Sequence, residues 1–290
     1  MKKKISFIGI GVIGASIASH LLKNNREITI FNRTKQKSIE FKEKYKELKV
    51  NIAESSLEAG ENKDYIFSCV GNDDDLNEIY FSKNGFFEVI KEDTCVIDHT
   101  TSSEKFSKFC YKKFKKKKSF FLDCPVSGGE IGAKEGNLSI MVGGDAKVFK
   151  KVKNIFKLYS RSVVYMGESG NGQLAKMVNQ ICIASLIQGL SEGLNFGKKK
   201  GLQLEPLIKA ISKGAAQSWQ MDNRAKTMWN NKFNFGFMNK LMVKDLNIIE
   251  ECAKEAGIMI PITEEVLEFY KKLIQNSPND DTSSLIRLLK

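Results

Sequence analysis

Short apolar runs alternate with longer, more polar segments through the first part of the chain, and this alternation stops near residue 167. Runs rich in Val, Ile and Phe that are separated by helix-like segments are typical of strands buried on both faces of a parallel sheet. The pattern predicts strands at 5–11, 27–32, 50–53, 65–71, 94–100, 119–126, 138–144 and 162–167. We therefore expect an α/β fold with an N-terminal, doubly wound parallel sheet.

Beyond residue 167 the apolar positions recur at helical spacing, and the strand pattern disappears. Glycines at the ends of the helical segments mark where the helices stop. The predicted helices cover 173–200, 205–213, 218–228, 241–256 and 263–275. We therefore expect two domains, an α/β domain over residues 1–166 and an all-helical domain over residues 167–290, joined through the helix that begins at residue 173.

The charge balance raises the question of a nucleic-acid partner. Lys and Arg exceed Asp and Glu by 46 to 34, which gives a formal charge of +12, and part of the excess lies in the run Tyr111–Lys118. We interpret this run as the solvated end of a helix and expect no nucleic-acid partner. A basic surface would nevertheless attract anionic cofactors and carboxylate substrates.

Cysteine usage and hydropathy exclude other classes. The six cysteines form no C-x-x-C pair and the only imidazoles are His20 and His99, so we expect no metal site. We expect no signal peptide, because no apolar h-region or cleavage site follows the N-terminal lysines, and no apolar run is long enough for a membrane span. We expect a cytoplasmic protein that has no membrane partner.

The stretch GIGVIG joins the first predicted strand directly to a helix. It is the G-x-G-x-x-G pattern in the strand–turn–helix context of a dinucleotide-binding domain of the Rossmann type. Gly9 permits the tight turn, Gly11 lets the backbone approach a pyrophosphate, and Gly14 lets the helix pack closely on the strand. The residues predicted to contact the cofactor here are Gly9, Ile10, Gly11, Val12, Ile13 and Gly14.

The second strand ends in Asn32, Arg33 and Thr34. A domain selective for NAD usually carries Asp or Glu at this place, where the carboxylate holds the ribose 2′-hydroxyl. A guanidinium group instead binds a 2′-phosphate through charge-assisted hydrogen bonds. We therefore predict that these three residues contact the cofactor and that it is NADP, with NAD as the alternative.

Two further loops follow predicted strands at the edge where a doubly wound sheet binds its ligand. Val70 and Asn72 follow the fourth strand and are predicted to contact the cofactor, whereas Asp73–Asp75 are interpreted as helix caps stabilised by the helix dipole. The segment Ser127–Gly129 follows the sixth strand. Its hydroxyl and unhindered backbone amides suit a small anion.

Lys176 lies in the first turns of a helical stretch that carries no other charge before Glu192, and Asn179 follows on the same face. Burial of a lysine in such a helix would lower its pKa and suit it to proton transfer near neutral pH. The alternative is a structural lysine whose stem packs while its head reaches water. We predict that Lys176 and Asn179 are the catalytic pair.

Taken together, these motifs resemble the β-hydroxyacid dehydrogenases, a family that includes 3-hydroxyisobutyrate dehydrogenase, tartronate semialdehyde reductase and the glyoxylate/succinic semialdehyde reductases. The resemblance rests on four stretches in order, GIGVIG, DCPVSGG, GNGQLAKMVN and KDL, the last of which begins at Lys244. It extends over nearly the whole chain. Ile13 stands where the family prefers Met, and Cys124 where it prefers Ala.

The resemblance implies a role for each motif. Lys176 is the general acid/base and Asn179 supports it, and both contact the substrate. The residues implied to bind the substrate carboxylate are Ser127, Gly128 and Gly129. Two further residues are implied to contact the cofactor, namely Thr101 and, on the nicotinamide side, Lys244.

The expected enzyme moves a hydride between NADP(H) and a small hydroxy acid or semialdehyde, such as 3-hydroxyisobutyrate, tartronate semialdehyde or succinic semialdehyde, while Lys176 protonates the alkoxide. An NADPH-dependent imine reductase is an alternative, because imine reductases share the architecture. A non-catalytic NADP-binding or nucleic-acid-associated module is a second alternative, which Lys176 and Asn179 disfavour. The uncharged stretch Met177–Ser191 requires cover from partner helices, so we expect a homodimer or homotetramer.

Overall fold

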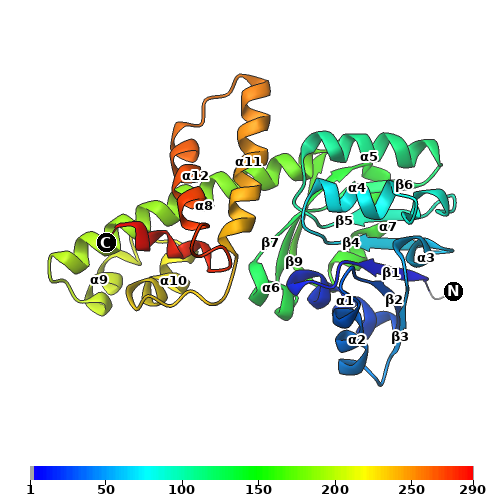
Figure 1. Ribbon diagram of the computed structural model, residues 1–290, viewed down its shortest axis with the longest axis horizontal. Coiled ribbons are helices and arrows are strands. Elements are labelled where there is room, and N and C mark those ends of the chain that lie inside the picture. Colours follow the sequence, from blue (N-terminus) through cyan, green and yellow to red (C-terminus); the bar gives the residue numbers. More distant parts are fainter. Residues whose placement is uncertain (1–2, 290) are drawn as a thin grey trace. The chain divides into compact units, whose positions relative to one another are not determined.

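The apolar runs of the first half form one nine-stranded sheet in the computed structural model, which describes residues 3–289 (Figure 1). The strands are β1 (Ile5–Ile8), β2 (Glu27–Phe31), β3 (Lys49–Ile52), β4 (Tyr65–Ser68), β5 (Cys95–Asp98), β6 (Phe120–Asp123), β7 (Val126–Ser127), β8 (Leu138–Gly144) and β9 (Ser160–Gly167). The strand predicted at 119–126 is in fact two strands, β6 and β7. Pro125 separates them, because its nitrogen carries no hydrogen to donate to a ladder.

The strand order is β3-β2-β1-β4-β5-β6-β8-β7, with β9 paired to β8. Strands β1 to β6 pair in parallel, whereas β8 runs antiparallel to β6 and β7. Ile8 at the end of β1 pairs with Phe31 on one side and Ser68 on the other, so the chain leaves β1, β2 and β4 at the same level. This is the doubly wound order of a Rossmann-type domain, which reverses between β1 and β4. The predicted fold class is confirmed.

Helices connect the strands and cover the sheet (Figure 1). They are α1 (Val12–Asn25), α2 (Lys35–Lys44), α3 (Ser56–Gly60), α4 (Asp73–Phe81), α5 (Glu104–Lys116), α6 (Gly129–Glu135) and α7 (Ala146–Phe156), with a 3-10 turn η1 (Phe86–Glu88). The apolar side chains of α7 show why these segments are helical, because they recur every three or four residues and are buried. They are Val148, Phe149, Val152 and Phe156.

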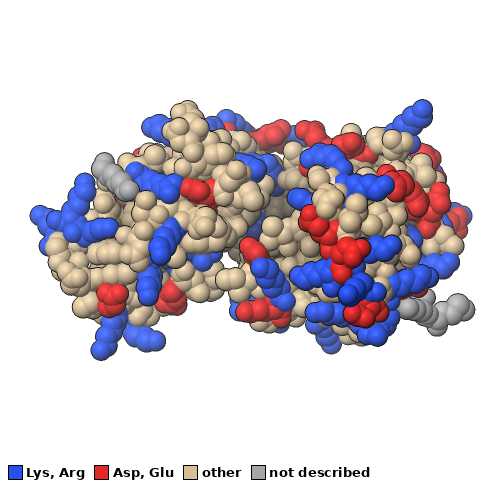
Figure 2. All heavy atoms as spheres, turned by 60° about the horizontal axis from the view of Figure 1, so that its bottom comes forward, with Lys and Arg blue, Asp and Glu red and all other residues tan. Residues whose placement is uncertain are grey.

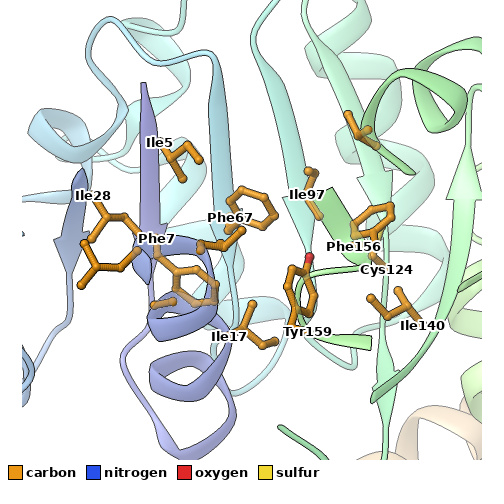
Figure 3. Close-up of a cluster of buried hydrophobic side chains, with 14 of the residues drawn as sticks. Ile5, Phe7, Ile17, Ile28, Phe67, Ile97, Cys124, Ile140, Phe156 and Tyr159 are labelled. Atoms are coloured by element: carbon orange, nitrogen blue, oxygen red, sulfur yellow. The ribbon is translucent and has the colours of Figure 1, made fainter. Parts of the chain in front are cut away.

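Both faces of the sheet are buried, each under its own apolar cluster. Phe67 and Ile97 belong to the cluster shown in Figure 3, whereas the residues that precede them, Ile66 and Val96, belong to the other cluster. This alternation follows from the period of two along a strand. Phe67 stacks on Phe7 with ring centroids 6.0 Å apart. Burial on both sides explains why the strands are continuous apolar runs in the sequence.

The chain divides into two compact units, Met1–Lys176 and Met177–Lys290, named here the sheet unit and the helical unit. The division falls inside helix α8 (Asn171–Lys199), whereas the sequence placed the boundary between residues 166 and 167. The first turn of α8 belongs to the sheet unit because the 169–173 segment is hydrogen-bonded to residues at the ends of β5 and β6.

After α8, the helical unit contains α9 (Leu204–Ile211), α10 (Trp219–Trp229), α11 (Asn239–Ala256), α12 (Pro261–Leu273) and a 3-10 segment η2 (Thr282–Leu289). The predicted helices are confirmed, whereas η2 was not predicted. Pro261 begins α12, a position where the missing N–H of proline costs no hydrogen bond. Leu194, Met228 and Ile286 meet in one apolar cluster that ties η2 to α8 and α10. Among residues 3–289, no helix is both long and apolar enough to cross a membrane.

Candidate dinucleotide and active site

The segments predicted to bind cofactor and substrate leave the sheet at one edge. Gly9–Gly14 follow β1, Asn32–Thr34 follow β2, and Val70–Asn72 follow β4. Thr101 follows β5, and Ser127–Gly129 come after β6. Because β1 to β6 are parallel, these are all carboxyl ends, and the reversal of strand order lies between β1 and β4. This is the place at which open parallel sheets bind their ligands.

The three glycines of the loop after β1 differ in what surrounds them. Gly9 has φ +97°, and a Cβ atom there would come 2.2 Å from the carbonyl oxygen of Cys69. A Cβ atom on Gly14 would come 2.0 Å from the carbonyl oxygen of Gly9. A Cβ atom on Gly11 would meet nothing within 4 Å. Gly9 and Gly14 are therefore required by packing inside the protein, whereas Gly11 keeps an open approach to the backbone.

Gly11 is also the N-cap of α1 and provides no side-chain acceptor for the first amides of that helix. The unpaired N–H groups and the helix dipole make such an end suitable for an anion. Val12 is exposed beside it, while Ile10 is buried. The residues present thus fit the pyrophosphate of a dinucleotide at the start of α1.

Asn32 joins the loop after β1 to the loop after β2. Its Oδ1 accepts a hydrogen bond from the amide of Ile10 at 2.8 Å, and its Nδ2 donates to the carbonyl of Thr34 at 3.0 Å. The side chain therefore holds the two predicted cofactor-binding loops in a fixed relation. The sequence predicted that Asn32 contacts the cofactor, and the structure adds this bracing role.

Arg33 forms an ion pair that the sequence did not suggest. Its Nη1 lies 2.7 Å from Oδ1 of Asp75, although the Arg33 side chain is 76% exposed. The other oxygen of Asp75 accepts a hydrogen bond from the amide of Gly71 at 3.1 Å. Asp75 thus connects the guanidinium group to the loop after β4, and it partly neutralises the positive charge predicted to select NADP.

The caps of α4 also differ from the interpretation of Asp73–Asp75. The N-cap is Asn72, whose side chain accepts from the amide of Asp75 at 2.8 Å. Asp73 accepts hydrogen bonds from the backbone and the hydroxyl group of Ser103. The interpretation of the aspartates as caps is therefore wrong in detail. They lie in the first turn of α4, but Asn72 is the N-cap, while Asp73 reaches Ser103 and Asp75 reaches the amide of Gly71. Val70 donates its amide to the hydroxyl of Thr100 at 3.0 Å.

The loop after β6 has the backbone that its glycines predict. Gly128 and Gly129 have φ of +130° and +62°, and Gly129 faces open space. Ser127 precedes them in β7, which pairs with β8. Positive φ at two successive residues turns the chain sharply into α6, a conformation that residues with a Cβ rarely adopt. The N-cap of α6, Gly128, makes no side-chain cap hydrogen bond, so the first amides of this helix are not capped by it and suit the predicted anion site.

Lys176 lies on α8 and is 7% exposed. One turn earlier, the side chain of Gln173 accepts from the amide of Ser102 at 3.1 Å and donates to the carbonyl of Thr100 at 2.8 Å. Residues three apart share a face of a helix, so Lys176 lies on the face of α8 that contacts the end of β5. Sequence reasoning missed Gln173.

Within the helical unit, Asn179 and Lys244 are linked through two residues that the sequence did not single out. Asn179 donates to the side-chain oxygen of Gln180, and Gln180 donates to Oδ2 of Asp245. Lys244 lies 2.8 Å from Oδ1 of Asp245. Gln180 and Asp245 are both buried. The structure therefore places these two predicted residues in one polar network.

Two buried titratable groups follow one another at the end of β5. Burial raises the pKa of Asp98 to about 7, although Ser68 and the amide of Thr100 donate to its carboxylate. Burial lowers the pKa of His99 to about 4. Nδ1 of His99 lies 2.7 Å from the carbonyl of Cys124, which can only accept, so His99 is a neutral donor at this atom. Among residues 3–289, no group of three His, Cys, Asp or Glu side chains is placed to hold a metal ion.

The lysine run Tyr111–Lys118 lies at the end of α5 and in the turn after it. Lys117 and Lys118 form ion pairs with Glu88 and Glu92 at 2.9 and 2.8 Å. On the face shown in Figure 2, Lys and Arg are spread over the surface, with Asp and Glu among them. Part of the positive run is therefore balanced locally by acidic side chains.

Two family models match the chain. The model described as the NAD binding domain of 6-phosphogluconate dehydrogenase matches residues 4–167, which is more than half of the chain. The model described as the NAD-binding of NADP-dependent 3-hydroxyisobutyrate dehydrogenase matches residues 170–289. The two matches follow one another and leave little of the chain uncovered.

Similar proteins match over their whole length. An uncharacterised oxidoreductase of Shewanella frigidimarina is 42% identical over 288 residues, covering 99% of this chain and 98% of that protein. The 2-hydroxy-3-oxopropionate reductase of Escherichia coli is 31% identical over 290 residues, covering 99% and 97%. A solved structure of Mycobacterium tuberculosis 3-hydroxyisobutyrate dehydrogenase with L-serine has a TM-score of 0.90 at 23% identity and covers 100% of both chains. That likeness shows a shared fold.

The surroundings of Gly11 and Gly14 lead to opposite expectations for the same substitution. Gly11→Ala adds a methyl group in open space at φ −82°, so the melting temperature should stay within about 2 °C while dinucleotide affinity falls by about tenfold or more. Gly14→Ala forces a methyl group against the backbone of Gly9 and should lower the melting temperature by about 5 °C or more. Thermal unfolding and fluorescence titration with NADPH and NADH measure both. Unchanged NADPH affinity in Gly11→Ala would show that this loop does not hold the pyrophosphate.

Proposed function

The chain belongs to the β-hydroxyacid dehydrogenase family, and from this premise we propose that it interconverts a small hydroxy acid and its semialdehyde or keto form with NADP as the preferred cofactor. The family makes it an NAD(P)-dependent oxidoreductase that acts on CH–OH groups. The observation that carries the finer proposal is the position of Lys176. It is buried on α8, one turn after a glutamine that is bonded to the end of β5.

The residues that would hold the cofactor lie along the carboxyl edge of the sheet. The amides of Gly9–Gly14 would hold the pyrophosphate, and Asn32–Thr34 would hold the adenosine ribose. Val70, Asn72 and Thr101, in the loops after β4 and β5, would contact the rest of the dinucleotide. Lys244, in the helical unit, is proposed to contact the nicotinamide. The nicotinamide ring, when bound, supplies or accepts the hydride. Side chains and backbone amides of the protein would bind the substrate and transfer the proton.

The substrate carboxylate binds at Ser127–Gly129, where backbone amides follow a sharp turn. Lys176 donates a proton to the oxygen that becomes the hydroxyl group in reduction, and its neutral amine takes that proton back in oxidation. Asn179 orients the same oxygen through its side-chain amide. The Escherichia coli relative is a 2-hydroxy-3-oxopropionate reductase, which supports a substrate of this size.

A substrate screen tests the proposed reaction class. NADPH oxidation should be detectable with at least one of glyoxylate, succinic semialdehyde and tartronate semialdehyde, or NADP reduction with 3-hydroxyisobutyrate. Each presents a carboxylate close to the reacting carbon, which is what an amide-lined anion site and a neighbouring proton donor require. Absence of turnover with all four would contradict the proposal.

Lys176→Ala should lower turnover by about 10²–10⁴-fold with the best of these substrates, the usual effect of removing a positioned acid/base. Lys176→Arg should restore little, because a guanidinium keeps its proton and cannot cycle it. NADPH affinity should change much less than turnover, since the phosphates and the ribose are held elsewhere. Steady-state kinetics with NADPH titration measures all three. A folded Lys176→Ala protein that keeps near wild-type turnover would refute the role of Lys176.

Arg33 and Asp75 should set the choice between NADP and NAD in opposite directions. Arg33→Ala removes a charge-assisted contact and should weaken NADP by about 1.5–3 kcal/mol, roughly tenfold to a hundredfold, with little effect on NAD. Asp75→Asn keeps an acceptor for the amide of Gly71 but removes the charge beside Arg33, so NADP should bind more tightly. Dissociation constants of NADP and NAD for both variants measure this selectivity. Equal weakening of NADP and NAD by Arg33→Ala would contradict the selectivity.

Self-association is proposed to occur through α8. The residues that face solvent along one stripe of this helix, each three or four positions after the last, are Val178, Cys182, Leu186, Gly189, Gly193 and Phe196. Val178 and Phe196 are 61% and 66% exposed, and an apolar stripe of this length favours a partner helix. A homodimer or homotetramer is expected by light scattering at micromolar concentration, and Leu186→Glu should shift it toward the monomer. A monomeric wild-type protein would contradict this proposal.

A further inference from the structure

We propose that Asp123 is a positioning residue for Lys176: its buried carboxylate holds the first turn of α8 against the sheet and thereby sets where the lysine stands. This inference rests on the proposed function, in which Lys176 transfers the proton. Asp123 ends β6 and has no exposed surface. It is the first residue of the stretch DCPVSGG. The sequence predicts an anion site at Ser127–Gly129 in this stretch but indicates no role for Asp123.

The carboxylate of Asp123 accepts hydrogen bonds from the segment that starts α8. Oδ1 accepts from the amide of Gly170 at 2.8 Å and from the hydroxyl of Ser169 at 3.3 Å. Oδ2 accepts from the amide of Gln173 at 3.2 Å. The first amides of a helix have no partner within it, and a negative charge at that end is favoured by the dipole. Asp123 thus caps a helix that lies about 50 residues further along the chain.

Glycines on two sides make room for this carboxylate. A Cβ atom on Gly172 would come 2.6 Å from the carbonyl oxygen of Asp123 and 2.7 Å from its Oδ2. A Cβ atom on Gly143, in β8, would come 2.5 Å from Oδ2. The strand end, the neighbouring strand and the start of α8 are therefore packed around one carboxylate. Because neither glycine has a side chain, these backbones can pack directly on the carboxylate, and the hydrogen bonds from Ser169, Gly170 and Gln173 hold the start of α8 there.

The electrostatics of Asp123 depend on the same segment. Burial raises the pKa of its carboxyl group, whereas the amides of Gly170 and Gln173 act against that rise. A buried carboxylate is costly unless hydrogen bonds replace its water, so α8 and the carboxylate stabilise one another. If α8 moved away, Asp123 would lose the donors that make its burial tolerable.

The link to Lys176 is short. Gln173 is bound at its backbone by Asp123 and at its side chain by the backbone of Ser102 and Thr100. Lys176 follows three residues later on the same helical face, with no flexible segment between. A displacement of about 1 Å of a group that acts on the substrate can cost about a hundredfold in rate. Release of the Asp123 contacts should therefore act on turnover more than on cofactor binding.

The decisive comparison is Asp123→Asn against Asp145→Asn. Asp145 caps α7 in the same unit by accepting from the amides of Lys147 and Val148, and α7 carries no proposed site residue. We expect Asp123→Asn to lower turnover with succinic semialdehyde and NADPH, or with the best substrate of the screen, by about 10–100-fold. NADPH affinity should change by less than about threefold, and amides of residues 169–176 should exchange hydrogen faster than in wild type.

Asp145→Asn should leave turnover and exchange at residues 169–176 unchanged, even where it lowers the melting temperature. Equal loss of turnover in the two variants would overturn the inference, because it would mean that any weakened helix cap in this unit acts alike. Unchanged turnover in a folded Asp123→Asn protein would also overturn it.

Ser169→Ala provides the test if Asp123→Asn does not fold, because it removes one donor to the carboxylate and leaves the charge in place. A loss of turnover of about threefold or more, at wild-type melting temperature and NADPH affinity, supports the inference, and no loss overturns it.

Lys176→Ala separates this outcome from failure of the proposed function. If Lys176→Ala keeps its turnover, the proton-transfer role is wrong, and hydrogen exchange at residues 169–176 still decides whether Asp123 holds α8. If Lys176→Ala is inactive while Asp123→Asn is fully active, only the positioning role is wrong.

Discussion

The parallel pairing of β1 with β2 on one side and β4 on the other is the constraint on which the rest of the sheet unit depends. Together with the parallel pairs that continue it to β3, β5 and β6, this pairing points strands β1 to β6 in one direction, so the loops proposed to carry the chemistry emerge at one edge. It also brings backbones very close there. Gly9 passes so near the carbonyl of Cys69 that no side chain fits between them. The glycine pattern is thus first a packing requirement, and the open space at Gly11 is what remains for a ligand.

Close packing at this edge removes water from polar groups, and hydrogen bonds within the protein replace that water. Ser68 donates to Asp98, Thr100 receives the amide of Val70, and Gln173 binds the backbone on both sides of Thr101. Buried groups held in this way have few alternative arrangements. Such rigidity suits the proposed site, in which a hydride must reach the carbonyl carbon while a proton reaches the oxygen of the same group.

The anion sites proposed for this protein depend on local geometry more than on total charge. Part of the basic excess lies in the run Tyr111–Lys118, and the basic side chains of Arg33, Lys117 and Lys118 are paired with carboxylates. By contrast, the starts of α1 and α6 present backbone amides without a side-chain cap. Amides at fixed positions discriminate between anions in a way that scattered ammonium groups cannot, because water and salt screen exposed charges.

The sequence by itself determined the elements and their order, because apolar period, glycine conformation and helix-stop signals are properties of residues close together in the chain. From short motifs it also predicted a cofactor loop, an anion loop and a catalytic lysine. The tertiary structure decided which polar side chains those motifs depend on. Asp75 reaches Arg33, Gln173 reaches Ser102, and Asp123 reaches Gly170 across separations of 42, 71 and 47 residues. A sequence shows that such a residue is polar, but only the folded backbone brings its distant partner within hydrogen-bonding distance.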